Sequence, residues 1–195
     1  MKTQPVNYDK LYNEARKMFF NDSNAYSLER KSEYLAYLLA LESGLRVSDL
    51  LEQKYSNFNY NEKIGRYCFT TFIKKTKGEH TGVISNELYH YIQEYKDAVR
   101  TITNRFSEYI FYNYRTNKPY TRQWLHKRIK MIAKKLKFKN AGVHSIRKAS
   151  AIFVLDKTGS LSMAQYHLSH KRATTTDKYL GVTQATALEQ LARVF

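Results

Sequence analysis

The residues with the most promising chemistry lie between Gly142 and Tyr179. His144 and Arg147 are three positions apart, so on a helix they share one face. His170 follows a second short apolar segment, and Tyr179 comes nine residues later, after a run of three threonines. We expect three short helices to bring these side chains toward a common point.

These side chains, together with Arg46 and a lysine, favour a reaction on a phosphodiester. Guanidinium groups donate paired hydrogen bonds to non-bridging oxygens, where charge accumulates as a nucleophile adds. A tyrosine with a pKa near 10 is ionised only about one part in a thousand at neutral pH, so Tyr179 needs an electropositive pocket or a base. His144 and His170 can supply that help, and a lysine on a hairpin tip could protonate the departing 5′ oxygen. Because carboxylates do not cluster near these residues, we expect no metal site, no glycosidase chemistry and no cofactor.

The composition favours a nucleic-acid partner. The 195 residues are 43% hydrophobic, enough for one domain with a sizeable core, and their formal net charge of +16 favours a polyanion. A membrane-surface protein is the competing interpretation, but the sequence has no long apolar run, signal peptide or lipidation motif. Cys68 is the single cysteine, which excludes an internal disulfide and a cysteine-based zinc site. We expect a cytoplasmic, nucleoid-associated protein without membrane contact.

Apolar periodicity predicts the helices that must position these residues. Gly44 and Gly159 are expected to stop two of them, and Ser48 to cap a short helix after Arg46. The predicted helices cover residues 8–20, 28–43, 86–99, 122–138, 143–158, 161–168 and 187–195.

From residue 55 the pattern changes to strands. Alternation predicts strands at 55–60, 64–74 and 80–84, with a turn at 77–79 whose basic tip carries Lys74, Lys75 and Lys77. A short extended segment is expected around 109–111. The predicted fold class is therefore α+β, mostly α-helical, with a small three-stranded antiparallel sheet at one edge.

The helix capped by Thr121 has one apolar face and one strongly basic face. The basic charges repel each other and no acid is expected to offset them, so we expect this face to follow DNA phosphates. Lys135 and Lys137 belong to the same face. The predicted DNA-binding residues are Lys74, Lys77, Arg122, Lys127, Arg128, Lys130 and Lys134.

In combination these segments resemble the tyrosine recombinases, also called phage-type integrases, over residues from about 28 to 185. The run ALESGLRVSDLL, which contains Arg46, is similar to the first arginine box of that family. The run HSIR matches its H-x-x-R box with His144 and Arg147. The run LSH, followed by two threonines and Tyr179, resembles its Leu-Gly-His, Thr-Thr, Tyr box, with the nine-residue spacing of that box.

The resemblance implies a reaction and roles for the matched residues. Tyr179 would attack a DNA phosphodiester and form a 3′-phosphotyrosyl link, which the 5′-hydroxyl of a partner strand then resolves without ATP or metal. The residues expected to stabilise the transition state are Arg46, Arg147, His144 and His170. His144 would also manage the tyrosine proton. Lys75 would be the general acid, favoured over Lys77 because Lys-Thr is the commoner form of this hairpin.

The resemblance also implies how the chain is divided and assembled. Residues 1–27 are expected to form a short N-terminal helical extension, 28–182 the catalytic domain, and 183–195 a C-terminal helix exchanged between subunits. The partners implied are double-stranded DNA with a specific recombination site and three further copies in a tetramer. The short N-terminus resembles fimbrial-switch invertases and predicts weak DNA affinity alone, or dependence on an accessory protein.

One departure and two alternatives accompany this resemblance. Ser169 stands where the family has glycine, a change expected to be tolerated if the backbone angle there is ordinary. A topoisomerase-like enzyme would use similar residues but rejoin the original strand. A catalytically inactive DNA-binding or recombination-accessory protein would keep the fold without the chemistry. The sequence does not specify the target site, or whether the outcome is integration, excision, inversion or resolution.

Overall fold

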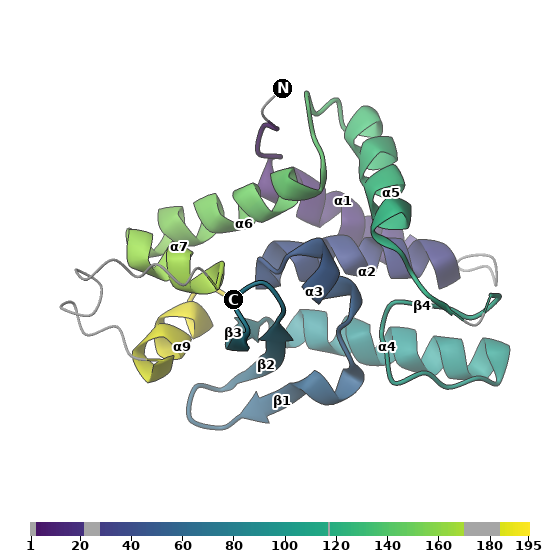
Figure 1. Cartoon of the computed structure of the whole chain (residues 1–195), viewed down its shortest axis with the longest axis horizontal. Helices are drawn as coiled ribbons and strands as arrows, with labels where there is room; N and C mark the ends of the chain where they lie inside the picture. The colour runs from purple at the N-terminus through teal and green to yellow at the C-terminus, as the bar shows by residue number, and fades with distance from the viewer. Residues whose placement is uncertain (1–2, 22–27, 117, 170–183) are drawn as a thin grey trace.

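The computed structural model describes residues 3–21, 28–116, 118–169 and 184–195. The order of its elements is α1 (Tyr8–Asn21), α2 (Leu28–Ser43), α3 (Val47–Leu51), η2 (Tyr55–Asn57), β1 (Phe58–Asn61), β2 (Arg66–Ile73), β3 (Gly78–Ile84), α4 (Asn86–Thr103), β4 (Tyr112–Asn113), β5 (Lys118–Pro119), α5 (Arg122–Lys135), α6 (Val143–Thr158), α7 (Leu161–His167) and α9 (Gln184–Ala192). Figure 1 shows this arrangement.

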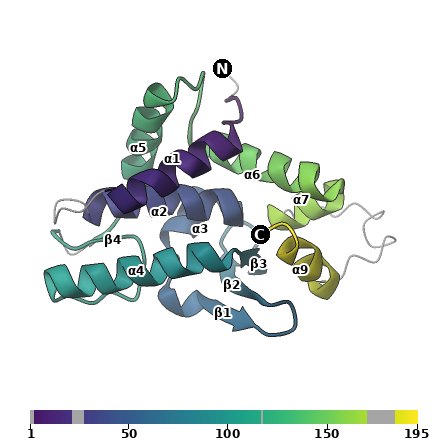
Figure 2. The ribbon, with the colours of Figure 1, turned by 180° about the vertical axis from the view of Figure 1, so that it is seen from behind.

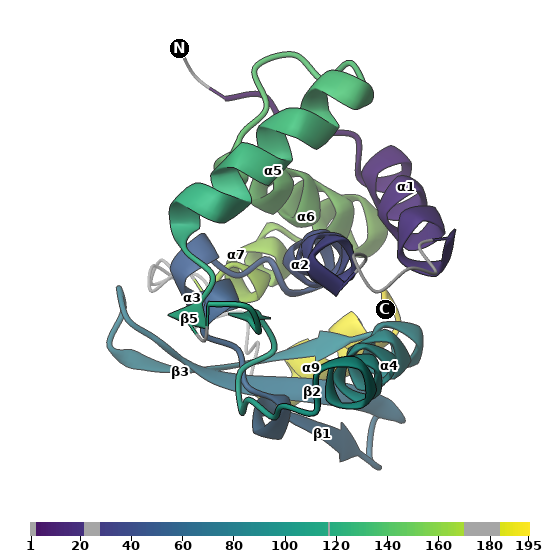
Figure 3. The ribbon, with the colours of Figure 1, turned by 90° about the vertical axis from the view of Figure 1, so that its right-hand side faces the viewer.

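Helix α2 is the centre of the main core. It packs against α1, α4, α6 and β3, and Figure 3 shows it nearly end-on, with α1 and α6 above it and α4 and the sheet below it. Its leucines and alanines are almost entirely buried, including Leu35, Leu38 and Leu39 at 0% exposure. A helix that is apolar on most of its circumference is stable only when neighbours surround it, and here they do.

The sheet is three-stranded and antiparallel, as predicted, and its strands lie in the order β1-β2-β3. The first two strands are shorter than expected, because residues 55–57 form a 3₁₀ turn and the hairpin turn begins at residue 74. The third strand is two residues longer than expected, because it begins at Gly78. Gly82 faces Phe69 across the ladder, and a Cβ at Gly82 would lie 2.5 Å from that ring, so the register requires a glycine there. A second, two-stranded sheet of β4 and β5 was not predicted.

Several helix ends follow the local signals in the sequence. The Ser85 and Thr121 side chains accept from backbone N–H groups at the starts of α4 and α5, at 3.0 and 3.2 Å. Gly44 and Gly159 end α2 and α6 with φ of +59° and +66°. The expectation for Ser48 was wrong: α3 begins at Val47, and Ser48 lies inside the helix.

Helix α1 is part of the main core. Its Leu11, Ala15 and Phe19 are buried against α2. Tyr12 donates a 2.8 Å hydrogen bond to Glu42 of α2, and the Ser85 backbone amide and hydroxyl donate to the same carboxylate. Burial raises the pKa of Glu42 to about 7. The described part of the predicted N-terminal extension is therefore joined to the rest of the fold by both apolar and polar contacts.

Helix α9 packs in a second, smaller apolar cluster, on the side of β3 away from α4 (Figure 2). Leu191 and Ala187 of this helix are fully buried there, with Val83 of β3 and Met163 of α7. Overall, the mostly helical α+β class with a small three-stranded antiparallel sheet is confirmed.

Candidate active site

Arg147 joins three helix ends. It lies in the second turn of α6, where the Ser145 hydroxyl accepts a 3.0 Å hydrogen bond from the Gly142 backbone amide and fixes the start of the helix. Its two terminal nitrogens, Nη1 and Nη2, donate to the backbone carbonyls of Gly44, after α2, and Leu168, after α7. A guanidinium has five N–H donors, so three remain for another ligand.

Arg46 lies beside Arg147 and has spare hydrogen-bonding capacity. Its Nη1 atom is buried and has no hydrogen-bond partner among the described residues. Burial, followed by the positive charge of Arg46, lowers the pKa of Arg147 to about 10. Two neighbouring guanidiniums repel each other, and an anion bound by both offsets this repulsion. The arrangement therefore favours binding of an anion such as a phosphate.

Asp49 is the buried carboxylate next to this pair. Burial raises its pKa, and the positive charge of Arg46 opposes that rise. Its Oδ2 has no partner within the described ranges. One carboxylate beside two guanidiniums leaves the group with a positive charge.

Two buried histidines, which the sequence analysis did not single out as site residues, lie close to the arginines. His80 of β3 packs edge-on against Phe69, with its Nε2 unpartnered among the described atoms. Burial, followed by the charges of Arg147 and Arg46, lowers its pKa to about 4. Burial also lowers the pKa of His167 to about 3. Both imidazoles are therefore neutral at neutral pH; the only sequence signal for either was a polar residue in an apolar pattern.

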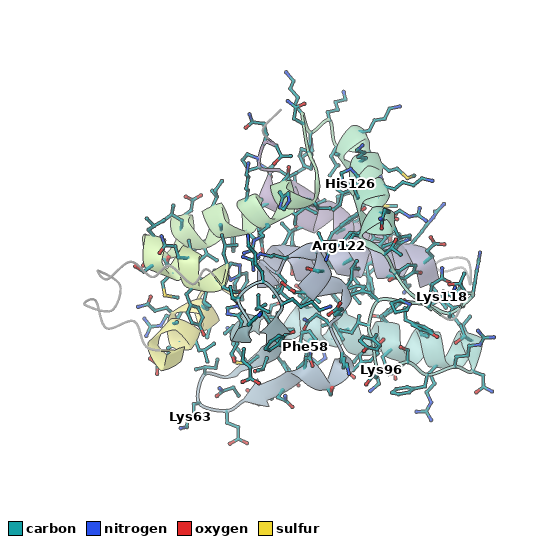
Figure 4. All side chains as sticks on the ribbon, in the orientation of Figure 1. Phe58, Lys63, Lys96, Lys118, Arg122 and His126 are labelled. Carbon is teal, nitrogen blue, oxygen red and sulfur yellow. The ribbon has the colours of Figure 1, made fainter. Side chains whose placement is uncertain are left out.

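His144 is exposed and lies between two surface hollows. The first, of about 580 Å³, also contains Arg46 and, from α5, Arg122, His126 and Lys127. Figure 4 shows that the Arg122 and His126 side chains belong to α5. The second, of about 550 Å³, is lined by Arg147 and by apolar groups of α6 and the N-terminal segment. The predicted residues Arg46, His144 and Arg147 thus meet at one surface.

The basic face of α5 is only partly as expected. Arg122, Lys127, Lys130 and Lys134 are exposed. Arg128 is instead half-buried and pairs with Glu29 and, at 3.6 Å, with Glu33 of α2. Lys135 pairs with Glu14 of α1 at 2.6 Å. The expectation that no acid offsets these cations was wrong, because the carboxylates come from helices far away in the sequence.

The three lysines of the hairpin tip all lie in the turn between β2 and β3. Lys74 pairs with Glu52, next to α3, while Lys75 and Lys77 are exposed. Lys77 adopts a left-handed backbone conformation with φ of +49°. Since the turn presents both Lys75 and Lys77, the choice of Lys75 as general acid stays a prediction.

His170 and Tyr179, the remaining predicted site residues, lie outside the described residues. Ser169, directly before them, has φ of +50°, so the condition that its backbone angle be ordinary is not met. A non-glycine residue in this region costs about 1 kcal/mol, and the Ser169 hydroxyl is also buried without a partner among the described groups.

A membrane span or a metal cluster is not found in the part of the chain that the structure describes. None of the described helices is long and apolar enough to cross a bilayer. Among the same residues, His, Cys, Asp and Glu nowhere form a group of three that could hold a metal ion.

Comparison with known proteins gives consistent results. The sequence profile described as "Phage integrase family" matches residues 5–186. The chain is 23% identical over 158 residues to a probable integrase/recombinase, YoeC, of Bacillus subtilis, covering 81% of this chain and 82% of that protein. It is 24% identical over 185 residues to a probable integrase/recombinase of Acholeplasma phage L2, covering 94% of this chain and 61% of the phage protein.

Solved structures share the fold. The XerH site-specific recombinase, bound to a palindromic difH substrate after cleavage, matches with a TM-score of 0.69 and 18% identity over 90% of this chain. The chain spans about half (49%) of the length of XerH. The catalytic core of lambda integrase matches with a TM-score of 0.57 and 21% identity, over 88% of this chain and 93% of that core.

Proposed function

Because this chain belongs to the phage integrase family, we propose that it is a site-specific DNA recombinase that cleaves and rejoins strands through a 3′-phosphotyrosyl intermediate. The observation that carries this proposal is the Arg147 guanidinium, held on two backbone carbonyls beside Arg46, whose Nη1 has no hydrogen-bond partner among the described residues. Such a pair suits the non-bridging oxygens of one phosphate.

In the proposed reaction the Tyr179 oxygen attacks phosphorus, and the bond from phosphorus to the 5′ oxygen breaks. Lys75 protonates that leaving oxygen, and His144 takes the tyrosine proton. Arg46, Arg147 and His170 hold the charge that accumulates on the phosphoryl oxygens. The 5′-hydroxyl of a second strand then attacks the phosphotyrosyl link and frees Tyr179, so the number of phosphodiester bonds is unchanged.

Double-stranded DNA with a specific recombination site is the proposed substrate. The hollow between His144 and α5 has basic walls, and the exposed cations of α5 continue beyond it. Arg128 is the weakest of the proposed DNA contacts, because carboxylates already pair with it. We place the protein in the cytoplasm, on the nucleoid.

Assembly on DNA is proposed as a tetramer that exchanges the C-terminal helix between subunits. Helix α9 buries its apolar face on β3 and α7 of its own chain, which is the kind of surface that the same helix of a second copy would fit. Dependence on an accessory protein and the likeness to fimbrial-switch invertases stay predictions.

The deciding experiment incubates the protein with a nicked suicide substrate carrying its candidate site and analyses the products on a denaturing gel. Wild type is expected to form a covalent protein–DNA adduct, and Tyr179→Phe to form none while binding the DNA equally well. Tight binding by wild type without an adduct would contradict the enzyme and favour the accessory protein. Rejoining of the original strand alone, on a two-site substrate, would favour the topoisomerase-like alternative.

A further inference from the structure

A buried polar pair, Ser150 and His167, lies close to Arg147. His167 is the last residue of α7 and is 2% exposed; Ser150 of α6 is fully buried. The Ser150 hydroxyl lies 2.7 Å from His167 Nε2 and 2.5 Å from the Leu41 carbonyl oxygen. The pair therefore connects α6, α7 and the last turn of α2.

The positions of the protons follow from these partners. A carbonyl oxygen only accepts, so the single Ser150 hydroxyl proton is donated to Leu41. The Ser150 oxygen must then accept from His167, whose Nε2 carries the proton. The imidazole is neutral, because burial lowers its pKa to about 3.

His167 also touches the two segments whose carbonyls hold Arg147. A Cβ at Gly44 would lie 2.7 Å from His167 Nε2, so the imidazole packs against the backbone of Gly44. Leu168, whose carbonyl accepts from Arg147 Nη2, is the next residue along the chain. Both acceptors of the guanidinium are thus adjacent to His167.

We propose that His167 is a positioning residue: through its hydrogen bond to Ser150 it holds the Gly44 and Leu168 carbonyls at the separation that the Arg147 guanidinium needs. This role rests on the proposed function, in which Arg147 binds the phosphate of the DNA. A buried polar pair costs free energy that an apolar pair would not, unless its hydrogen bonds are made. Both hydrogen bonds of Ser150 are made, and they fix the orientation of the imidazole. An apolar side chain in its place would have no hydrogen bond to fix its orientation.

The test compares His167→Gln with His167→Leu. The Gln amide nitrogen can occupy the position of Nε2 and donate to Ser150, whereas Leu fills the space without a donor. We expect the single-turnover rate of adduct formation at saturating DNA to stay within about threefold of wild type for Gln. For Leu it should fall by about tenfold or more, because small misplacements of a catalytic group have large effects. The dissociation constant for DNA should change less than about twofold in both, because the exposed cations that dominate affinity are untouched.

Two further measurements separate this role from simple stability and from failure of the proposed function. Ser150→Ala keeps the imidazole but removes its acceptor, and should resemble His167→Leu even if the Leu variant is too unstable to assay. Arginine-selective ¹⁵N NMR, with Arg147→Lys for assignment, should show guanidinium protons of Arg147 protected from exchange in wild type and Gln, but not in Leu.

The outcomes distinguish the two proposals. Equal cleavage by wild type, Leu and Ser150→Ala would overturn the positioning role, as would a Gln variant that folds normally but is as slow as Leu. No adduct from wild type would contradict the recombinase, and the NMR comparison would then decide the positioning role alone.

Discussion

The positive charges of this protein occur in two settings that differ in what holds them. The Arg147 guanidinium is held by backbone carbonyls at the ends of α2 and α7. The lysines of α5 are exposed on flexible side chains, and Lys135 pairs with a carboxylate of another helix. A charge fixed by the backbone can meet one particular oxygen atom, whereas an exposed lysine adds affinity wherever a phosphate passes.

The largest effect is expected where the fixed charge is changed. Arg147→Lys keeps the positive charge but puts its donors on a single nitrogen, which lacks the planar fork that holds two carbonyls through Nη1 and Nη2. We expect the rate of adduct formation to fall on the order of 100-fold or more, as for the loss of a donor to a developing oxyanion. The measurement is a single-turnover time course at saturating nicked DNA, with binding by gel shift as control. A rate within a few-fold of wild type would show that charge alone suffices at this position.

An intermediate effect is expected at the glycine that supports this site. Gly44→Ala would place a methyl group 2.7 Å from His167 Nε2 at a residue with φ of +59°. Gly159→Ala is the matched control, with φ of +66° but no atom within 4 Å of the new Cβ. We expect the free energy of unfolding to fall by about 1 kcal/mol for Gly159→Ala and about 3 kcal/mol for Gly44→Ala, measured by urea denaturation. Equal losses would mean that backbone conformation, not the contact with His167, makes Gly44 necessary.

The smallest effect is expected on the exposed face of α5. Lys127 lines the basic hollow, whereas Lys135 pairs with Glu14 of α1. We expect Lys127→Ala to weaken DNA binding a few-fold and to lower the slope of log affinity against log salt by about 1, while Lys135→Ala leaves the slope unchanged. Titrations at several salt concentrations measure both. The distinction between the two lysines fails if both variants change the slope equally.

The accuracy of the sequence-based predictions depended on how local each signal was. Thr121 was predicted as a helix cap because the cap and the amide that it accepts from are three residues apart. Arg128 was predicted to be an unpaired cation, yet its carboxylate partners lie 99 and 95 residues away in the sequence. Spacing along one helix shows which face a side chain occupies, but not what lies opposite that face.

For the candidate site, too, the local features were predicted from the sequence and the contacts between distant segments were not. The sequence by itself determined the mostly helical fold with its small sheet, and the order of Arg46, His144 and Arg147, because periodicity and short motifs are properties of neighbouring residues. Only the tertiary structure decided that Arg147 is held by the Gly44 and Leu168 carbonyls. It also decided that His80 and His167 are buried and neutral beside it. Burial and hydrogen bonding between distant segments arise only when the helices pack, and they determine the pKa and the position of a charged group.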